Sequence, residues 1–358
     1  MNIAEGNKKY FTKSLMDWHY IANQRALPWK QEKNPYKIWL SEIILQQTRA
    51  QQGLPYYLKF TKMFPRVRDL ASALDEEVFR LWQGLGYYNR CKNMLATARL
   101  ITNELNGDFP NTYDGLLKLK GIGPYTAAAI GSFAFGLPCA VVDGNVYRVL
   151  SRYFGIDTPY DSNEGKKEFQ ALALELLHPK DSSAHNQAIM DLGATVCTPA
   201  SPLCDDCPLQ AKCTAYKQQL ISYLPVKSKK ITIRKRYFNY ILLYSNDTVW
   251  IHKRTDKDIW ENLFQPYLIE SAELLDSVQL KEQKEFELLN VNGNKLEYEG
   301  YLTQRLTHQL IETRFFSMHF KKQPKISLKD GKWVSVKELE NFAFPKTIVS
   351  FLKKKLYF

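Results

Sequence analysis

Four of the six cysteines in this 358-residue chain lie close together, between Cys197 and Cys213. Cys197, Cys204, Cys207 and Cys213 are separated by six, two and five residues, in a stretch that also contains three prolines. Disulfides stabilise mainly small secreted domains, whereas this chain is long and begins without an apolar signal segment. Four thiolates can instead hold a zinc ion or a [4Fe–4S] cluster. Zinc sites usually take their ligands as two close pairs, so one close pair flanked by single cysteines favours the [4Fe–4S] cluster.

Length and composition indicate a globular protein with room for two domains. Hydrophobic residues make up 45% of the chain and charged residues 24%, which is ordinary for a chain that buries its own cores. No apolar run approaches the length that spans a bilayer, and clustered thiols imply a reducing compartment. The net charge of +12 favours a polyanionic partner, nucleic acid ahead of an anionic membrane. Charge alone is equally consistent with a basic surface that binds neither.

A single carboxylate interrupts an apolar segment near the N-terminus. Residues 36–52 are apolar at helical intervals and predict a helix, and Glu42 lies inside it. A glutamate is usually a solvated surface residue. The alternative is an acid beside a pocket, whose apolar neighbours raise its pKa.

The stretch from Leu116 to Ile130 has the form of a helix-hairpin-helix. The first helix ends at Gly121-Ile122-Gly123, where glycines permit left-handed conformations and close backbone approach. Pro124 then suits the first turn of an alanine-rich second helix, whose exposed amides can bind a phosphate oxygen. A simple turn between helices is the alternative, but the spacing of the two glycines favours binding to the DNA backbone without sequence preference.

Two further motifs carry candidate functional residues. Asp143 follows three apolar residues and precedes Gly144-Asn145, so we expect it to cap a helix over 146–152. Capping is compatible with catalysis, since a carboxylate at a helix N-terminus is held ionised and aimed. Earlier in the chain, Gly84 to Arg90 forms a turn with two tyrosines, which could wedge into stacked bases or pack in a core.

In this order and spacing, the motifs of roughly the first 220 residues resemble the helix-hairpin-helix DNA glycosylase superfamily that carries an iron–sulfur cluster. The motifs that resemble one branch, adenine DNA glycosylases of the MutY type, are Leu27-Pro28-Trp29, Ser41-Glu42 through Gln46-Gln47-Thr48, Gly84-Leu85-Gly86-Tyr87-Tyr88 and Val142-Asp143-Gly144-Asn145. The resemblance implies excision of adenine mispaired with 8-oxoguanine. The endonuclease III branch has a Schiff-base lysine in the hairpin, where this chain has Tyr125. A phenol cannot form an imine, so we expect a monofunctional glycosylase.

The resemblance also implies roles for individual residues. Glu42 would protonate adenine at N7 and then activate water, while Asp143 would stabilise the cationic sugar or attack it transiently. Tyr125 and Asn145 would support them. The residues expected at the flipped adenine and in the base stack are Trp29, Lys30, Leu45 and Gln187 for the pocket, and Gln47 and Tyr87 for the wedge. Lys30 stands where arginine is common, and lysine does not make the same bidentate contact. Gly121, Gly123 and Lys212 would contact the DNA backbone.

Beyond Tyr216 the composition changes. We expect a helix-hairpin-helix domain over 1–222, with its cluster loop at 197–213, and a basic linker over 223–236. Residues 237–358 alternate with period two between helical stretches, which predicts a smaller α+β domain. This part resembles, more weakly, the Nudix-like C-terminal domain of the same enzymes, without a glutamate-rich Nudix box. In the family a Phe-Ser-His loop reads 8-oxoguanine, and the matching place here is Leu306-Thr307-His308, which keeps the hydroxyl and imidazole but loses the aromatic ring.

The expected protein is therefore multi-domain, with an all-α glycosylase part and an α+β part. The expected partner is double-stranded DNA containing 8-oxoguanine:adenine or guanine:adenine mispairs, bound by a monomer that does not associate with membranes. The resemblance implies a bacterial-type, cytoplasmic enzyme. Two alternatives are a bifunctional pyrimidine glycosylase/lyase and a non-catalytic DNA-binding scaffold. The missing hairpin lysine argues against the first, and the presence of both Glu42 and Asp143 argues against the second.

Overall fold

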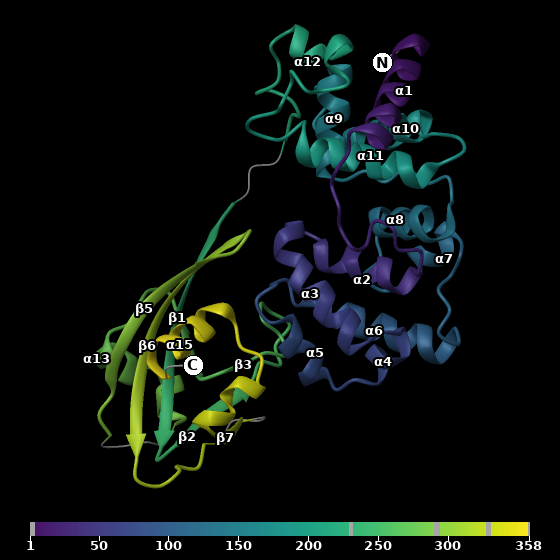
Figure 1. The fold of residues 1–358 in the computed structure, drawn as a ribbon. Helices are drawn as coiled ribbons and strands as arrows, with labels where there is room; N and C mark the ends of the chain where they lie inside the picture. Colours follow the sequence, from purple (N-terminus) through teal and green to yellow (C-terminus); the bar gives the residue numbers. More distant parts are fainter. Residues whose placement is uncertain (1–3, 229–231, 290–293, 327–330, 357–358) are drawn as a thin grey trace. The chain divides into compact units, whose positions relative to one another are not determined.

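The computed structural model describes residues 4–228, 232–289, 294–326 and 331–356, and divides into two compact units. The first unit comprises Met1–Ser72 and Asn93–Lys229, and the second comprises Ala73–Lys92 and Lys230–Phe358. The first unit is helical and the second contains the sheet (Figure 1). None of the helices in the described ranges is both long enough and apolar enough to cross a membrane.

One group of helices in the first unit surrounds the predicted hairpin. Its members are α2 (Pro35–Leu45), α3 (Ala50–Met63), α4 (Val67–Ser72), α6 (Asn89–Glu104), α7 (Tyr113–Leu117) and α8 (Pro124–Phe135). Helix α2 packs against α3 and α8, and α7 packs against α8. Most side chains of α2 and α8 are buried, which explains why their sequences are apolar on all sides.

The second group of helices holds the cysteine loop. It consists of α1 (Glu5–Ile21), α9 (Gly144–Phe154), α10 (Asn163–Leu176), α11 (Ser182–Thr195), the short η1 (Gln210–Lys212) and α12 (Thr214–Lys217). A shared core from α1, α9, α10 and α11 includes Phe11, Val149, Phe169 and Leu192. Cys197, Cys207 and Cys213 pack against this core, so the loop is an integral part of the helical fold.

The helix predicted over 36–52 is wrong in its extent. Helix α2 ends at Leu45, Gln46 is extended, and Gln47 has a left-handed backbone with φ 54°. A new helix, α3, begins at Ala50. Residues 46–49 are polar, and no glycine or proline marks the turn, so the sequence carried no clear signal for the break.

The sheet of the second unit has seven strands. They are β1 (Arg234–Ser245), β2 (Thr248–Lys253), β3 (Phe264–Gln265), β4 (Tyr267–Ser271), β5 (Glu297–Arg305), β6 (Gln309–Phe320) and β7 (Gly331–Ser335). The order is β3-β2-β1-β6-β5, with β4 paired to β1 and β7 paired to β2. Strand β1 runs parallel to β6 and antiparallel to β2 and β4. Strands β1 and β2 form a hairpin, with Asn246 left-handed in its turn.

Helices complete the second unit. They are α5 (Asp75–Trp82), α13 (Ser277–Lys281), α14 (Lys284–Glu287), η2 (Val336–Asn341) and α15 (Lys346–Leu356). One side of the sheet buries Ile241, Trp250 and Phe316. Phe351 of α15 stacks on Phe315 with ring centroids 3.9 Å apart.

The segment Ala73–Lys92 belongs to the sheet-containing unit although it precedes most of the helical unit in the chain. Gln83 accepts a hydrogen bond from the backbone N–H of Phe344 at 3.0 Å, and Lys92 pairs with Glu261 at 2.7 Å. The linker predicted over 223–236 also differs at its end, because β1 already begins at Arg234. Residues 229–231 of that linker lie outside the described residues.

Candidate active site and cysteine loop

A cavity of about 860 Å³ in the helical unit collects the predicted catalytic residues. Its lining includes Glu42 from α2, Tyr125 from α8, and Asp143 and Asn145 from the start of α9. Ligand pockets commonly have volumes of roughly 300–1,000 Å³, so a flipped nucleoside can be accommodated. Residues more than 100 positions apart in the chain thus meet in one cavity.

Glu42 is buried, with 6% of its surface exposed. Burial raises its pKa to about 7, and the nearby charge of Asp143 adds to the effect. The Tyr125 hydroxyl donates a hydrogen bond to the Glu42 carboxylate, which lowers that pKa without cancelling the rise. Of the two sequence interpretations, the structure supports the acid beside a pocket. A carboxyl group with this pKa can carry a proton near neutral pH and release it.

Asp143 is the N-cap of α9, as predicted. Its Oδ1 accepts hydrogen bonds from the backbone N–H groups of Asn145 and Val146, both at 2.8 Å. Its Oδ2 accepts a third from the Asn145 side chain at 2.8 Å. Burial raises the pKa of Asp143, and these hydrogen bonds oppose the rise because they favour the ionised form. The carboxylate is therefore held in one orientation at the positive end of a helix.

The two glycines of the hairpin between α7 and α8 differ in backbone conformation and in the space around them. Gly121 is left-handed, with φ 79°, and a Cβ there would lie 2.8 Å from the Cβ of Asn93. Gly123 has an extended backbone and caps α8, and a Cβ there would have nothing within 4 Å. The N-terminus of α8 is therefore open to a group approaching from outside.

Four of the six residues predicted for the adenine pocket and wedge line the cavity, namely Trp29, Lys30, Leu45 and Gln187. Gln47 and Tyr87 do not line it, and both side chains are exposed. Both have left-handed backbones, with φ 54° and 49°, which is unusual for residues other than glycine and marks them as the tips of tight turns.

Within the second unit, Tyr87 meets the predicted lesion loop. The hydroxyls of Tyr87 and Thr307 hydrogen-bond to each other. Thr307 and His308 are exposed between β5 and β6, in a turn closed by a hydrogen bond from Leu306 N–H to the Gln309 carbonyl at 2.7 Å. The structure therefore brings one wedge candidate and one lesion candidate together.

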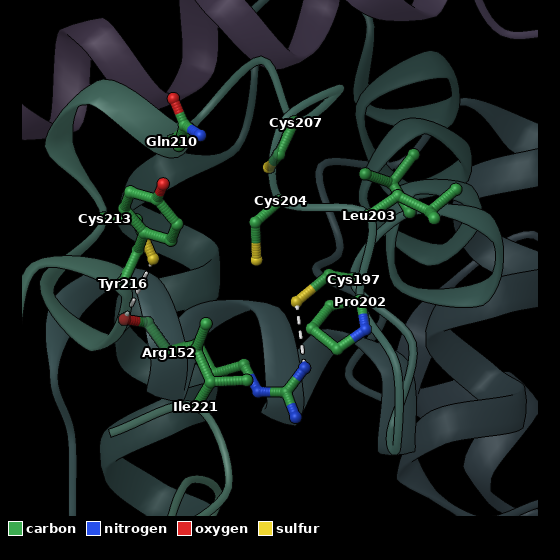
Figure 2. A pocket seen from close by; sticks show the side chains of 11 residues that line it. Arg152, Cys197, Pro202, Leu203, Cys204, Cys207, Gln210, Cys213, Tyr216 and Ile221 are labelled. Atoms are coloured by element: carbon green, nitrogen blue, oxygen red, sulfur yellow. Dashed lines mark hydrogen bonds between the residues drawn. The ribbon is translucent and has the colours of Figure 1, made fainter. Parts of the chain in front are cut away.

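The four clustered cysteines line one pocket, and their sulfur atoms point into it (Figure 2). Arg152 closes one side, donating to Cys197 Sγ at 3.5 Å and to the carbonyls of Thr198 at 2.7 Å and Pro199 at 2.9 Å. Among the described residues, no group of three or more His, Cys, Asp or Glu could hold a single metal ion. A cubane cluster needs four thiolates, each bound to a different iron, and the four cysteines around this pocket supply such a donor set.

Lys212, predicted to contact DNA, is exposed on η1 beside this loop. Its ammonium lies 4.7 Å from the centre of the Tyr10 ring. A cation over an aromatic face gains only about 0.5–1 kcal/mol at an exposed site, so the contact does not prevent the lysine from reaching a phosphate.

The sequence did not single out two further residues that line the cavity, Arg148 and Asp191. Arg148, one turn after Asn145 on α9, donates to Asn145 Oδ1 at 2.7 Å and to the Cys197 carbonyl at 2.7 Å. It thereby connects the residue that orients Asp143 with the start of the cysteine loop. Asp191 lies four residues after Gln187 on α11, on the same face of that helix. Both could have been found from their helical spacing to residues already identified.

Comparison with known proteins assigns the family. Residues 40–179 match the HhH-GPD superfamily of base excision DNA repair proteins, and residues 239–354 match the NUDIX domain. An adenine DNA glycosylase of Buchnera aphidicola subsp. Schizaphis graminum is 34% identical over 349 residues, covering 96% of this chain and 98% of that protein. This chain belongs to the adenine DNA glycosylase family. The adenine DNA glycosylase of Mus musculus is 43% identical over 217 residues, covering 58% of this chain and 42% of that protein.

Solved structures share the fold of the helical part of this chain. A thermostable thymine-DNA glycosylase matches with a TM-score of 0.55 and 30% identity, covering 60% of this chain and 98% of that chain. A trapped endonuclease III–DNA covalent intermediate has a TM-score of 0.53 at 21% identity and shares the fold. The predicted family, the two-part fold and the glycosylase class are confirmed, and DNA is the partner of an adenine DNA glycosylase. The roles of individual site residues remain predictions.

Proposed function

We propose that this chain excises adenine from duplex DNA where adenine is mispaired with 8-oxoguanine or guanine, which initiates base excision repair. The observation that carries the proposal is the pairing of carboxyl groups in one cavity: buried Glu42, with a pKa of about 7, and Asp143, held at a helix N-terminus. Adenine leaves a deoxyribose readily only when its ring is protonated, so such a pair suits the reaction.

In the proposed reaction Glu42 gives its proton to adenine N7. The bond from the sugar C1′ to adenine N9 breaks, and its electron pair goes to the base. Asp143 stabilises the oxocarbenium-like sugar by its charge or by a transient bond to C1′. Glu42, now ionised, takes a proton from the water that adds to C1′, which restores the starting state. Tyr125 and Asn145 hold the two carboxyl groups, as their hydrogen bonds to Glu42 and Asp143 support.

We infer that the enzyme is monofunctional. Tyr125 occupies the hairpin position where an imine-forming lysine would be needed, and it lines the cavity beside Glu42. A phenol cannot attack a sugar carbon to form a Schiff base. Excision should therefore end at an abasic site with the strand intact.

The remaining candidates fit supporting roles in this reaction. The open N-terminus of α8 at Gly123 supports a phosphate contact that positions the duplex. The hydrogen bond between Tyr87 and Thr307 supports a role for both residues in contacting the lesion. Gln47 is the second candidate for wedging into the base stack. Cys197, Cys204, Cys207 and Cys213 would hold a [4Fe–4S] cluster, which braces the loop that carries Lys212.

A direct assay tests the proposal. Purified protein is incubated with duplexes containing a single 8-oxoguanine:adenine, guanine:adenine or thymine:adenine pair, and free adenine is measured chromatographically. We expect adenine release from the first two duplexes and strand breakage only after alkali treatment. Glu42→Gln should still bind the 8-oxoguanine:adenine duplex without releasing adenine. Absence of release by cluster-loaded protein would refute adenine excision, and strand breakage without alkali would refute the monofunctional assignment.

A further inference from the structure

A buried carboxylate lines the cavity that also holds the proposed catalytic pair. Asp191 of α11 has a side chain that is only 3% exposed, yet it lines the cavity. Its Oδ1 accepts from Arg25 at 2.8 Å, and its Oδ2 accepts from Asn23 at 2.7 Å and from Lys30. All three donors lie in the segment between α1 and α2. The Asp191 side chain therefore holds that segment at three points.

The hydrogen bonds of Lys30 leave one donor for a ligand. An ammonium group has three N–H donors. Lys30 donates to the Arg25 carbonyl at 2.6 Å and to Asp191, so two of the three are taken. The Lys30 side chain is 15% exposed and lines the cavity. Among the described residues no acceptor takes the third N–H, and a purine ring in the cavity offers acceptors at its nitrogen atoms.

Helix α11 holds the same segment at a second point. Gln187, one turn before Asp191, donates from its side-chain amide to the Lys30 carbonyl at 2.9 Å. The amide oxygen of Gln187 is not used in this hydrogen bond. Lys30 is thus held through both its backbone and its side chain by two residues on one face of α11.

We propose that Asp191 is the positioning residue for adenine recognition: it holds the Lys30 ammonium in the cavity wall with one N–H directed to the flipped base. This inference rests on the proposed adenine excision. A lysine alone is a flexible point charge. The contact with Asp191 gives the Lys30 ammonium a fixed position. Asp191 also neutralises one of the two cations, Lys30 and Arg25, that would otherwise face each other in a partly buried place.

A purely structural role for Asp191 would change stability and DNA affinity in a different way. If Asp191 only attached the segment between α1 and α2 to α11, its loss would lower stability and weaken every DNA complex equally. If Asp191 acts through Lys30, its loss should weaken only complexes in which a base occupies the cavity. Two duplexes separate these cases: one carries a non-cleavable 2′-fluoro-deoxyadenosine opposite 8-oxoguanine, and the other carries a tetrahydrofuran abasic analogue, which has no base.

The test compares wild type with Asp191→Asn, Lys30→Met and the double variant, by affinity for both duplexes and by single-turnover adenine release. Asp191→Asn should bind the fluoro-adenosine duplex roughly 10- to 100-fold more weakly, the range for a hydrogen bond to a charged group, and the abasic duplex nearly as wild type does. In the Lys30→Met background the same change should have little further effect, because the group being positioned is gone. Asp191→Glu should recover part of the affinity.

Asp181→Asn is the matched control. Asp181 caps the same helix and accepts from Ala184 N–H at 2.9 Å, and asparagine caps helices equally well. It does not line the cavity, so this variant should behave as wild type. Equal weakening of both duplexes by Asp191→Asn, or full additivity with Lys30→Met, would overturn the inference. Absence of adenine release by the wild type would instead overturn the proposed function, so the two failures are distinguishable.

Discussion

At the scale of single residues, Glu42 is a carboxyl group buried where its ionised form is unfavourable, and its proposed role as an acid depends on this burial. Glu42 lies among buried side chains of α2, and burial is the first cause of its raised pKa. The hydrogen bond from Tyr125 compensates only in part. Such a group is useful as an acid, but it opposes folding at any pH where the unfolded chain would ionise it.

Glu42→Gln should therefore stabilise the protein at alkaline pH while abolishing adenine release. The folded pKa of about 7 exceeds the ordinary 4.5, so the folded state binds the extra proton between these values. Stability from this group is complete below about pH 4.5 and is lost as pH rises through about 7, a loss of roughly 3 kcal/mol. Urea unfolding should find the variant more stable at about pH 8 and little changed at about pH 4.5.

The control for this prediction is Glu340→Gln, which changes an exposed glutamate in the sheet-containing unit. Its stability should follow the wild type at both pH values. A Glu42→Gln variant with no gain at alkaline pH would show that the folded protein does not hold Glu42 protonated.

At the scale of elements, the hairpin between α7 and α8 separates a glycine needed for folding from a glycine available for binding. Gly121 has a left-handed backbone, and its missing side chain makes room for Asn93. Gly123 has neither requirement, since its φ of −94° is open to any residue and the space beside it is empty. The missing side chain at Gly123 is therefore explained by a group that approaches the N-terminus of α8 from outside the protein.

Gly123→Ala should keep the stability of the wild type and bind duplex DNA about tenfold more weakly, because a Cβ would hold a phosphate away from the α8 amides. Thermal unfolding and binding to an undamaged duplex at fixed salt measure the two effects. Gly6→Ala, at another open glycine in α1, serves as the control and should change neither quantity by much. Unchanged DNA affinity of Gly123→Ala would argue against a phosphate at this turn.

At the scale of the whole molecule, two long-range arrangements connect parts that are distant in the chain. Ala73–Lys92 belongs to the sheet-containing unit, which places Tyr87 beside Thr307. In the helical unit, Arg148 connects Asn145 to the cysteine loop through hydrogen bonds at both ends. Damage to the loop should therefore reach the residue that orients Asp143.

Cys207→Ser should reduce iron and sulfide content and lower both thermal stability and DNA affinity, because the loop packs against the core of the helical unit. Cys139→Ser is the matched control, since Cys139 is a free, half-buried cysteine outside the loop. It should keep the iron content of the wild type. Full iron content in Cys207→Ser would remove this residue from the proposed ligand set.

Much of this protein could be predicted from its sequence, because local rules produce most of its elements. Capping by Asp143 and the left-handed turn at Gly121 depend on residues near one another in the chain, and the structure agrees with both. Strand β1 does not alternate, because it lies inside the sheet and most of its residues are buried. The proposed catalytic pair, Glu42 and Asp143, could be named from the sequence because motifs and their order are local patterns. The break after Leu45 was missed because residues 46–49 are polar without a glycine or proline to mark the turn.

Only the tertiary structure decided the protonation state of the proposed catalytic residues and the hydrogen bonds that hold their neighbours. The pKa of Glu42 depends on burial among groups from α2, α8 and α9, which no local pattern specifies. Asp191 meets Lys30, and Arg148 meets the Cys197 carbonyl, only through tertiary packing across long separations in the chain. The sequence determined which residues could carry out the reaction, and packing across long separations in the chain determined which of them are protonated, oriented and in contact.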